Sequence, residues 1–171
     1  MNVSRLQFFS RFRALFCASV AAFLCAAGSA AAATATSTFT VTITITSACT
    51  VTTTSNMAFA STGLLNAAVN ATAGFNVTCS TGTSYAIGLD NGSNVSGSQR
   101  RMKGGASNSE YISYNLYSDS NHTVVWDNTT TVSGTGSGSA QSLIVYGQVP
   151  VQTTPSAASN YTDTVTVTVT Y

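Results

Sequence analysis

The sequence has 171 residues, of which only 6% are charged, with six Lys or Arg and five Asp or Glu. Three of the cations precede residue 14, so residues 34–171 carry a net charge of 3 − 5 = −2. Nucleic-acid binding needs clustered cations, and the one small cluster here, Arg100, Arg101 and Lys103, is expected in a glycine-rich turn. This composition argues against nucleic-acid binding and suits a chain whose strands pair with other strands.

Residues 1–33 have the pattern of a secretory signal peptide. Arg5, Arg11 and Arg13 precede the apolar run 14–27, and small residues follow it. Cleavage after Ala30, Ala33 or Ala35 satisfies the small-residue rule, and the pattern does not choose among them. A retained membrane anchor is the alternative, but the apolar run is shorter than the roughly 20 residues of a spanning helix.

Residues 38–46 alternate threonine with large apolar residues. Because successive side chains of a strand point to opposite faces, Phe39, Val41, Ile43 and Ile45 form one apolar face. This strand opens the expected mature chain, which is where an arm inserted into the sheet of another molecule would lie. The alternative is a first strand that pairs within its own chain.

Further strands are expected at 48–54, 74–80, 84–90, 110–117, 123–126, 142–147 and 162–171, with turn-rich segments between them and no helix of useful length. Such a series indicates an all-β sandwich or barrel. Cys17 and Cys25 leave with the signal peptide, so Cys49 and Cys79 remain. In an exported chain this pair most simply forms one disulfide.

The last expected strand, 162–171, repeats the alternation of the first. Val165, Val167, Val169 and Tyr171 form its apolar face. This strand is a candidate for the edge that receives an inserted arm.

The sequence carries little that suggests catalysis or a metal site. A serine relay would have to use His122, the only histidine, with Ser118, Asp119 or Ser120 in the same polar turn. The acids are scattered, no C-x-x-C motif occurs, and no glycine loop opens a helix. We expect no enzyme activity, no metal and no cofactor.

The order of several motifs resembles a known family. They are the alternating strand followed by Ser47-Ala-Cys-Thr-Val51, then Phe75-Asn-Val-Thr-Cys79, Arg101-Met-Lys103 with Ile112-Ser-Tyr-Asn-Leu-Tyr-Ser-Asp119, Val145-Tyr-Gly-Gln-Val-Pro150, and the final segment 161–171. Over essentially the whole mature chain, this pattern is similar to the single-domain pilin subunits of archaic chaperone-usher pili. Those subunits carry the spore coat protein U type domain.

The resemblance implies an immunoglobulin-like sandwich that lacks its last strand and is completed by a donor strand from a neighbouring subunit. It implies a donor arm at 34–47, with Phe39, Val41, Ile43 and Ile45 as its inserted residues, and a pilin domain at 48–171. The expected partners are identical or related pilin subunits, a periplasmic chaperone and an outer-membrane usher. The expected product is an extracellular pilus that serves surface attachment and biofilm formation.

A self-contained secreted sandwich that binds carbohydrate or acts as an adhesin is the alternative from another functional class. A sugar site needs exposed aromatic side chains. The candidates are Trp126, Tyr111, Tyr114 and Tyr117, although aromatic residues in strands more often lie in the core or in cross-strand pairs.

Overall fold

The computed structural model describes residues 31–158 and 161–171. Most of the expected signal peptide, including its apolar run, lies outside the described residues. Within the described ranges, no helix is long and apolar enough to cross a membrane. The chain divides into two units, residues 1–42 and residues 43–171, and every strand of the described residues belongs to the second.

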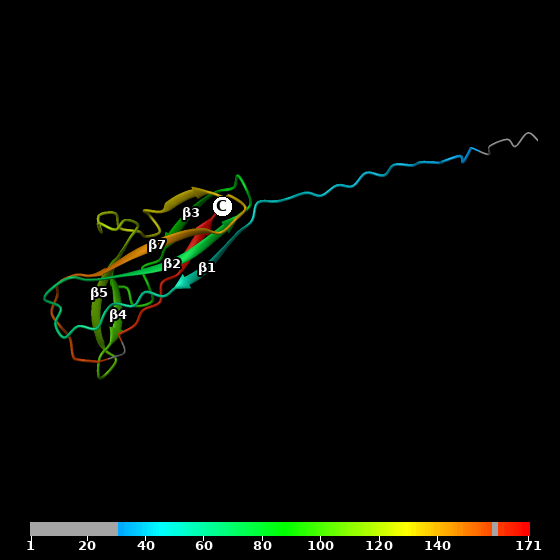
Figure 1. Ribbon diagram of the computed structural model, residues 1–171. Coiled ribbons are helices and arrows are strands. Elements are labelled where there is room, and N and C mark those ends of the chain that lie inside the picture. Colours follow the sequence, from blue (N-terminus) through cyan, green and yellow to red (C-terminus); the bar gives the residue numbers. More distant parts are fainter. Residues whose placement is uncertain (1–30, 159–160) are drawn as a thin grey trace, which may run out of the picture. The chain divides into compact units, whose positions relative to one another are not determined.

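Eight antiparallel strands form two sheets (Figure 1). The larger sheet has the order β1-β2-β7-β5-β4, and the smaller sheet has the order β6-β3-β8. The strands are β1 Cys49–Ser55, β2 Val69–Cys79, β3 Ser84–Leu89, β4 Arg100–Gly104, β5 Glu110–Tyr117, β6 Val132–Thr135, β7 Gln141–Val149 and β8 Val167–Thr170.

The core lies between the two sheets and draws on alternate residues of both. Phe75 and Val77 face it from the larger sheet, and Ile87 and Leu89 face it from the smaller sheet. Trp126 lies among them with 1% of its surface exposed, donating its indole N–H to the Ile87 carbonyl at 2.8 Å. This is an all-β, immunoglobulin-like sandwich, as the resemblance implied.

Six expected strands are present, five of them with shifted ends, while the predictions for residues 123–126 and for the cationic cluster were wrong. Residues 123–126 form only an isolated bridge between Val125 and Tyr117. The cationic cluster lies in β4 and not in a turn, because the guanidinium of Arg100 enters the core. Its Nε and Nη2 donate to the carbonyls of Asp90, Leu89 and Trp126 at 2.9 to 3.0 Å.

The expected first strand, 38–46, is not a strand in this single chain. Residues 31–48 form neither helix nor strand, and none of the strand pairs of the described residues includes them. A strand needs the backbone groups of a partner strand.

Candidate functional site

The two sheets leave an open side between β1 and β8. Each of these strands ends the order of its sheet, so among the described residues β1 pairs only with β2, and β8 only with β3. They nevertheless approach each other. The gap between β1 and residues 161–171, called the open groove below, is where one more strand would close the sandwich.

Apolar side chains on both walls of the open groove lack full cover. Val165, Val167 and Val169 pack against the core but are only half-buried. Val51 of β1 lies opposite the fully buried Val77 and so faces the same side of the sheet, yet it is 40% exposed. Of the expected receiving residues, Val165 and Val167 line the cavity described next, Val169 packs against the core, and Tyr171 at the end of the segment is 60% exposed.

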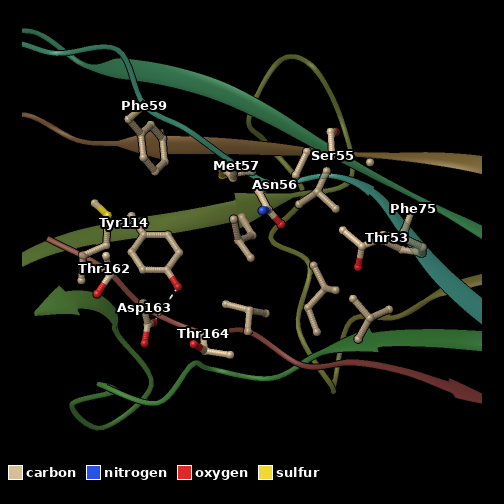
Figure 2. A pocket seen from close by; sticks show the side chains of 18 of the residues that line it. Thr53, Ser55, Asn56, Met57, Phe59, Phe75, Tyr114, Thr162, Asp163 and Thr164 are labelled. Atoms are coloured by element: carbon tan, nitrogen blue, oxygen red, sulfur yellow. Dashed lines mark hydrogen bonds between the residues drawn. The ribbon is translucent and has the colours of Figure 1, made fainter. Parts of the chain in front are cut away.

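A cavity of about 500 Å³ lies at one end of the open groove (Figure 2). Apolar side chains from both sheets make up much of its lining, together with hydroxyl, amide and carboxylate side chains. The lining includes Met57, Phe59, Phe75, Leu89, Met102, Tyr114, Leu116, Val145, Val165 and Val167, with Thr53, Ser55, Asn56, Thr162, Asp163 and Thr164.

Two carboxylates form hydrogen bonds that fix the wall of the open groove just before β8. Asp163 accepts a hydrogen bond from the Tyr114 hydroxyl at 2.7 Å and two from Asn94. Burial, together with the bond to Asp163, raises the pKa of Tyr114, which keeps its proton available for this contact. Asp90 accepts from the Thr166 amide at 2.9 Å. Burial opposes its ionisation, but hydrogen bonds from Thr166 and Gly92 outweigh that effect and lower the pKa of Asp90.

The expected donor residues are largely exposed in this single chain. Phe39, Val41, Ile43 and Ile45 are 88%, 81%, 84% and 74% exposed. Several large apolar side chains close together in the sequence are seldom all so exposed unless a partner covers them, because the burial of each stabilises a protein by about 1.5 to 3 kcal/mol.

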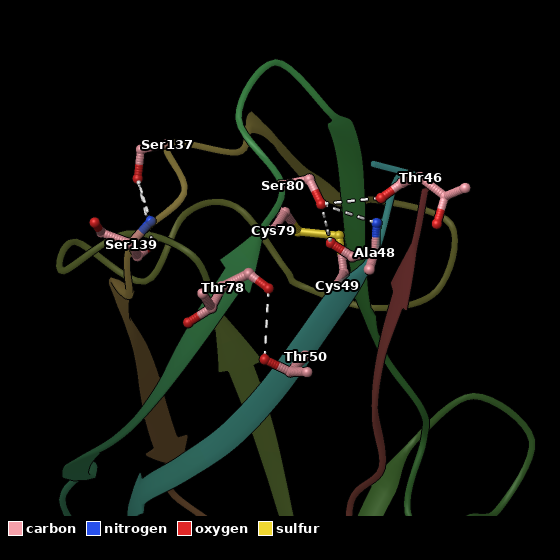
Figure 3. Close-up of a disulfide and its surroundings, with 9 residues drawn as sticks. All are labelled: Thr46, Ala48, Cys49, Thr50, Thr78, Cys79, Ser80, Ser137 and Ser139. Carbon is pink, nitrogen blue, oxygen red and sulfur yellow. Dashed lines mark hydrogen bonds between the residues drawn. A yellow bond between two sulfur atoms is a disulfide. The ribbon is translucent and has the colours of Figure 1, made fainter. Parts of the chain in front are cut away.

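The residues that follow the expected arm are firmly attached to the domain (Figure 3). Cys49 and Cys79 form the expected disulfide between directly opposite positions of β1 and β2. Next to it, the Ser80 hydroxyl accepts from the Ala48 amide at 3.2 Å and donates to the Thr46 carbonyl at 3.3 Å. The base of the arm is thus fixed to the end of β2.

Sequence reasoning missed much of the cavity wall. Met57 and Phe59 follow β1 in an irregular segment, where no periodic pattern marks a buried position. Tyr114 and Leu116 lie at alternate positions of β5, so the strand pattern placed them on one face without indicating a cavity.

The other candidate residues do not form a second site. The His122 ring packs edge-on against Tyr117, with ring centres 5.2 Å apart, and Asp119 accepts instead from Thr123 and Val124. Among the proposed sugar-binding aromatics, Trp126, Tyr114 and Tyr117 are buried. Tyr111 is 39% exposed and has the Arg101 guanidinium 4.1 Å from its ring centre.

Comparisons with known proteins agree with this architecture. The model of the Spore Coat Protein U domain matches residues 35–168. One similar solved structure is a chaperone–tip adhesion subunit pre-assembly complex from the archaic chaperone-usher Csu pili of Acinetobacter baumannii, with 25% identity and a TM-score of 0.55. That match covers 75% of this chain and 40% of the matched chain. No curated protein matches the sequence.

Proposed function

Because the chain belongs to the Spore Coat Protein U domain family, we propose that it is a structural subunit of an extracellular pilus built by the chaperone-usher pathway. The observation that carries this proposal is the open groove, in which half-buried apolar side chains line an unpaired edge of β8. The similarity to a chaperone–subunit complex from such pili supports the same class of function. In this role the chain acts by strand pairing and not as an enzyme.

The arm of residues 34–47 supplies the strand that the domain of residues 48–171 lacks. Its inserted residues, Phe39, Val41, Ile43 and Ile45, recur at every second position, as do the groove residues from Val165 to Tyr171. Burying four such side chains contributes on the order of 6 to 12 kcal/mol before the cost of ordering the arm. The unpaired edge of β8 adds backbone hydrogen bonds.

Arm and groove are different surfaces of one molecule, so the contact is head-to-tail and builds a fibre. During export through the periplasm, a chaperone strand fills the groove. At the outer-membrane usher, the arm of the next identical or related subunit replaces that strand. The resulting surface fibre serves attachment and biofilm formation.

The first experiment compares the exported protein with a variant lacking residues 38–45 on an unheated denaturing gel. The deletion keeps Thr46, which Ser80 binds. Wild type should give a ladder of multimers that collapses on boiling, and the deletion should not. A single monomer band from soluble, cooperatively folded wild type contradicts the proposal and favours a self-contained sandwich.

Charge substitutions on the two faces of the arm separate insertion from a general effect on solubility. Ile43→Asp places a carboxylate among the inserted residues and should abolish the ladder, because burying an unpaired charge is costly. Thr42→Asp is the matched control on the opposite face and should leave the ladder intact. Equal effects of the two substitutions contradict the assigned face.

Moving the arm tests whether it fills the groove of its own domain. In this variant, called the self-filled chain, residues 34–47 are deleted from their natural position. A copy of residues 36–47 is placed after Tyr171, behind a flexible linker of about ten residues. The linker reaches about 30 Å, whereas residues 39–45 extend about 20 Å, so the arm can enter in either direction. The self-filled chain should be a stable monomer. Continued polymerisation or aggregation would count against the groove as the receiving site.

A further inference from the structure

Two methionines that lie far apart in the sequence line the same cavity. The sequence has three, and Met1 begins the expected signal peptide. The other two, Met57 and Met102, both line the cavity of the open groove (Figure 2 labels Met57). Sequence proximity does not explain this, because Met57 follows β1 while Met102 lies in β4, the strand at the opposite edge of the larger sheet.

Both methionine side chains line the cavity, so small solutes that enter it meet them. Each methionine packs against the core and is half-buried. The Met57 sulfur lies directly over Gly147 of β7, a position where a larger side chain would collide with it. An inserted strand would cover the groove and close this access.

We propose that Met57 and Met102 form an oxidant-sensitive site. Their oxidation inactivates an empty groove, and a donor strand that fills the groove protects them. This inference rests on the proposed function. The reactant is a peroxide. The thioether sulfur attacks one oxygen of hydrogen peroxide, so that an S–O bond forms as the O–O bond breaks. The sulfur-bound oxygen loses its proton, and the departing hydroxide gains one and leaves as water. Methionine is oxidised by two electrons to its sulfoxide and hydrogen peroxide is reduced.

Oxidation changes what the cavity can bind. A sulfoxide is polar and has a strong acceptor oxygen, whereas the side chains offered by the arm are Phe, Val and Ile. Covering that oxygen without a donor is unfavourable. We expect an oxidised groove to bind the arm about tenfold more weakly or worse.

The test uses the full exported chain carrying Ile43→Asp, which keeps it from polymerising, and a synthetic peptide of residues 36–47. The peptide contains no Met, Cys, Trp or Tyr, so peroxide leaves the peptide itself unmodified. The chain is treated with hydrogen peroxide with and without bound peptide, and mass spectrometry of proteolytic fragments follows the sulfoxides of Met57 and Met102. Peptide affinity is then measured before and after treatment.

Both methionines should oxidise at least tenfold more slowly when the peptide is bound, and oxidation should weaken peptide binding about tenfold. The Met57→Leu, Met102→Leu double variant nearly conserves side-chain volume and should bind peptide equally well before and after peroxide. Equal oxidation rates with and without peptide, or unchanged affinity after oxidation, overturn this inference alone. Failure of the untreated chain to bind the peptide overturns the proposed function as well.

Discussion

Arg100→Met should be among the most destabilising single substitutions in this domain. Arg100 is 3% exposed, and its guanidinium donates to three backbone carbonyls, those of Leu89, Asp90 and Trp126. Methionine fills a similar volume but donates no hydrogen bond. Each buried carbonyl left without a donor costs about 1 to 3 kcal/mol.

Three such carbonyls give a gross loss of about 3 to 9 kcal/mol in the free energy of unfolding. The net loss is smaller, because the substitution also removes the cost of burying the guanidinium cation. Burial removes water from the guanidinium, which disfavours its charged form and lowers the pKa of Arg100. We expect a net loss of about 3 to 5 kcal/mol, against a total stability of about 5 to 15 kcal/mol for a domain of this kind.

The measurement is urea unfolding of the self-filled chain, in which an occupied groove does not vary between samples. Arg101→Met is the matched control. Arg101 is half-buried, donates to the Asn94 carbonyl at 3.1 Å and stacks on Tyr111, so its loss should cost about 1 kcal/mol. The reasoning is refuted if Arg100→Met is no more destabilising than Arg101→Met.

Three further predictions concern the frame of the groove. Replacing Cys49 and Cys79 together with Ala should lower the free energy of unfolding of the self-filled chain by about 3 to 4 kcal/mol, because the disulfide closes a 30-residue separation; an unchanged thermal midpoint would contradict this. Asp90 has a pKa below its ordinary value, so its contribution to stability is present above about pH 4 and is lost as the pH falls through the lowered pKa. Asp90→Asn should therefore make acid unfolding less steep, and identical pH profiles would argue against this role. Gly136→Ala should cost about 2 kcal/mol or more, because the new methyl meets the Cys79 backbone oxygen at 2.9 Å, whereas Gly63→Ala meets nothing within 4 Å; equal thermal midpoints of these two variants would exclude the clash.

The strands that sequence reasoning predicted are those whose side chains alternate in polarity. β5 and the second half of β2 show this alternation, and it also placed Val165, Val167 and Val169 on one face of the C-terminal segment. These positions were readable because burial of one sheet face leaves a period of two in the sequence.

The strands that were missed depend on contacts with distant residues. β4 begins with two arginines, and only the carbonyls around Arg100 explain why it is buried. β6 has the sequence Val-Ser-Gly-Thr, which reads as a turn. Its Gly134 leaves room for the ring of Tyr85, which lies directly beside it. Neither requirement is visible in local sequence.

The position of the disulfide also has a mechanical consequence. In a head-to-tail fibre, tension on one subunit would enter through its arm and reach the domain at Cys49, the first residue of β1. Without a covalent link, that pull would peel β1 from the sheet one hydrogen bond at a time. Through Cys79 the load passes instead to the end of β2, which pairs with β7 over most of its length and with β1 over the half nearest the disulfide. The bond thus lets the subunit resist force by shearing a central strand rather than by unzipping an edge.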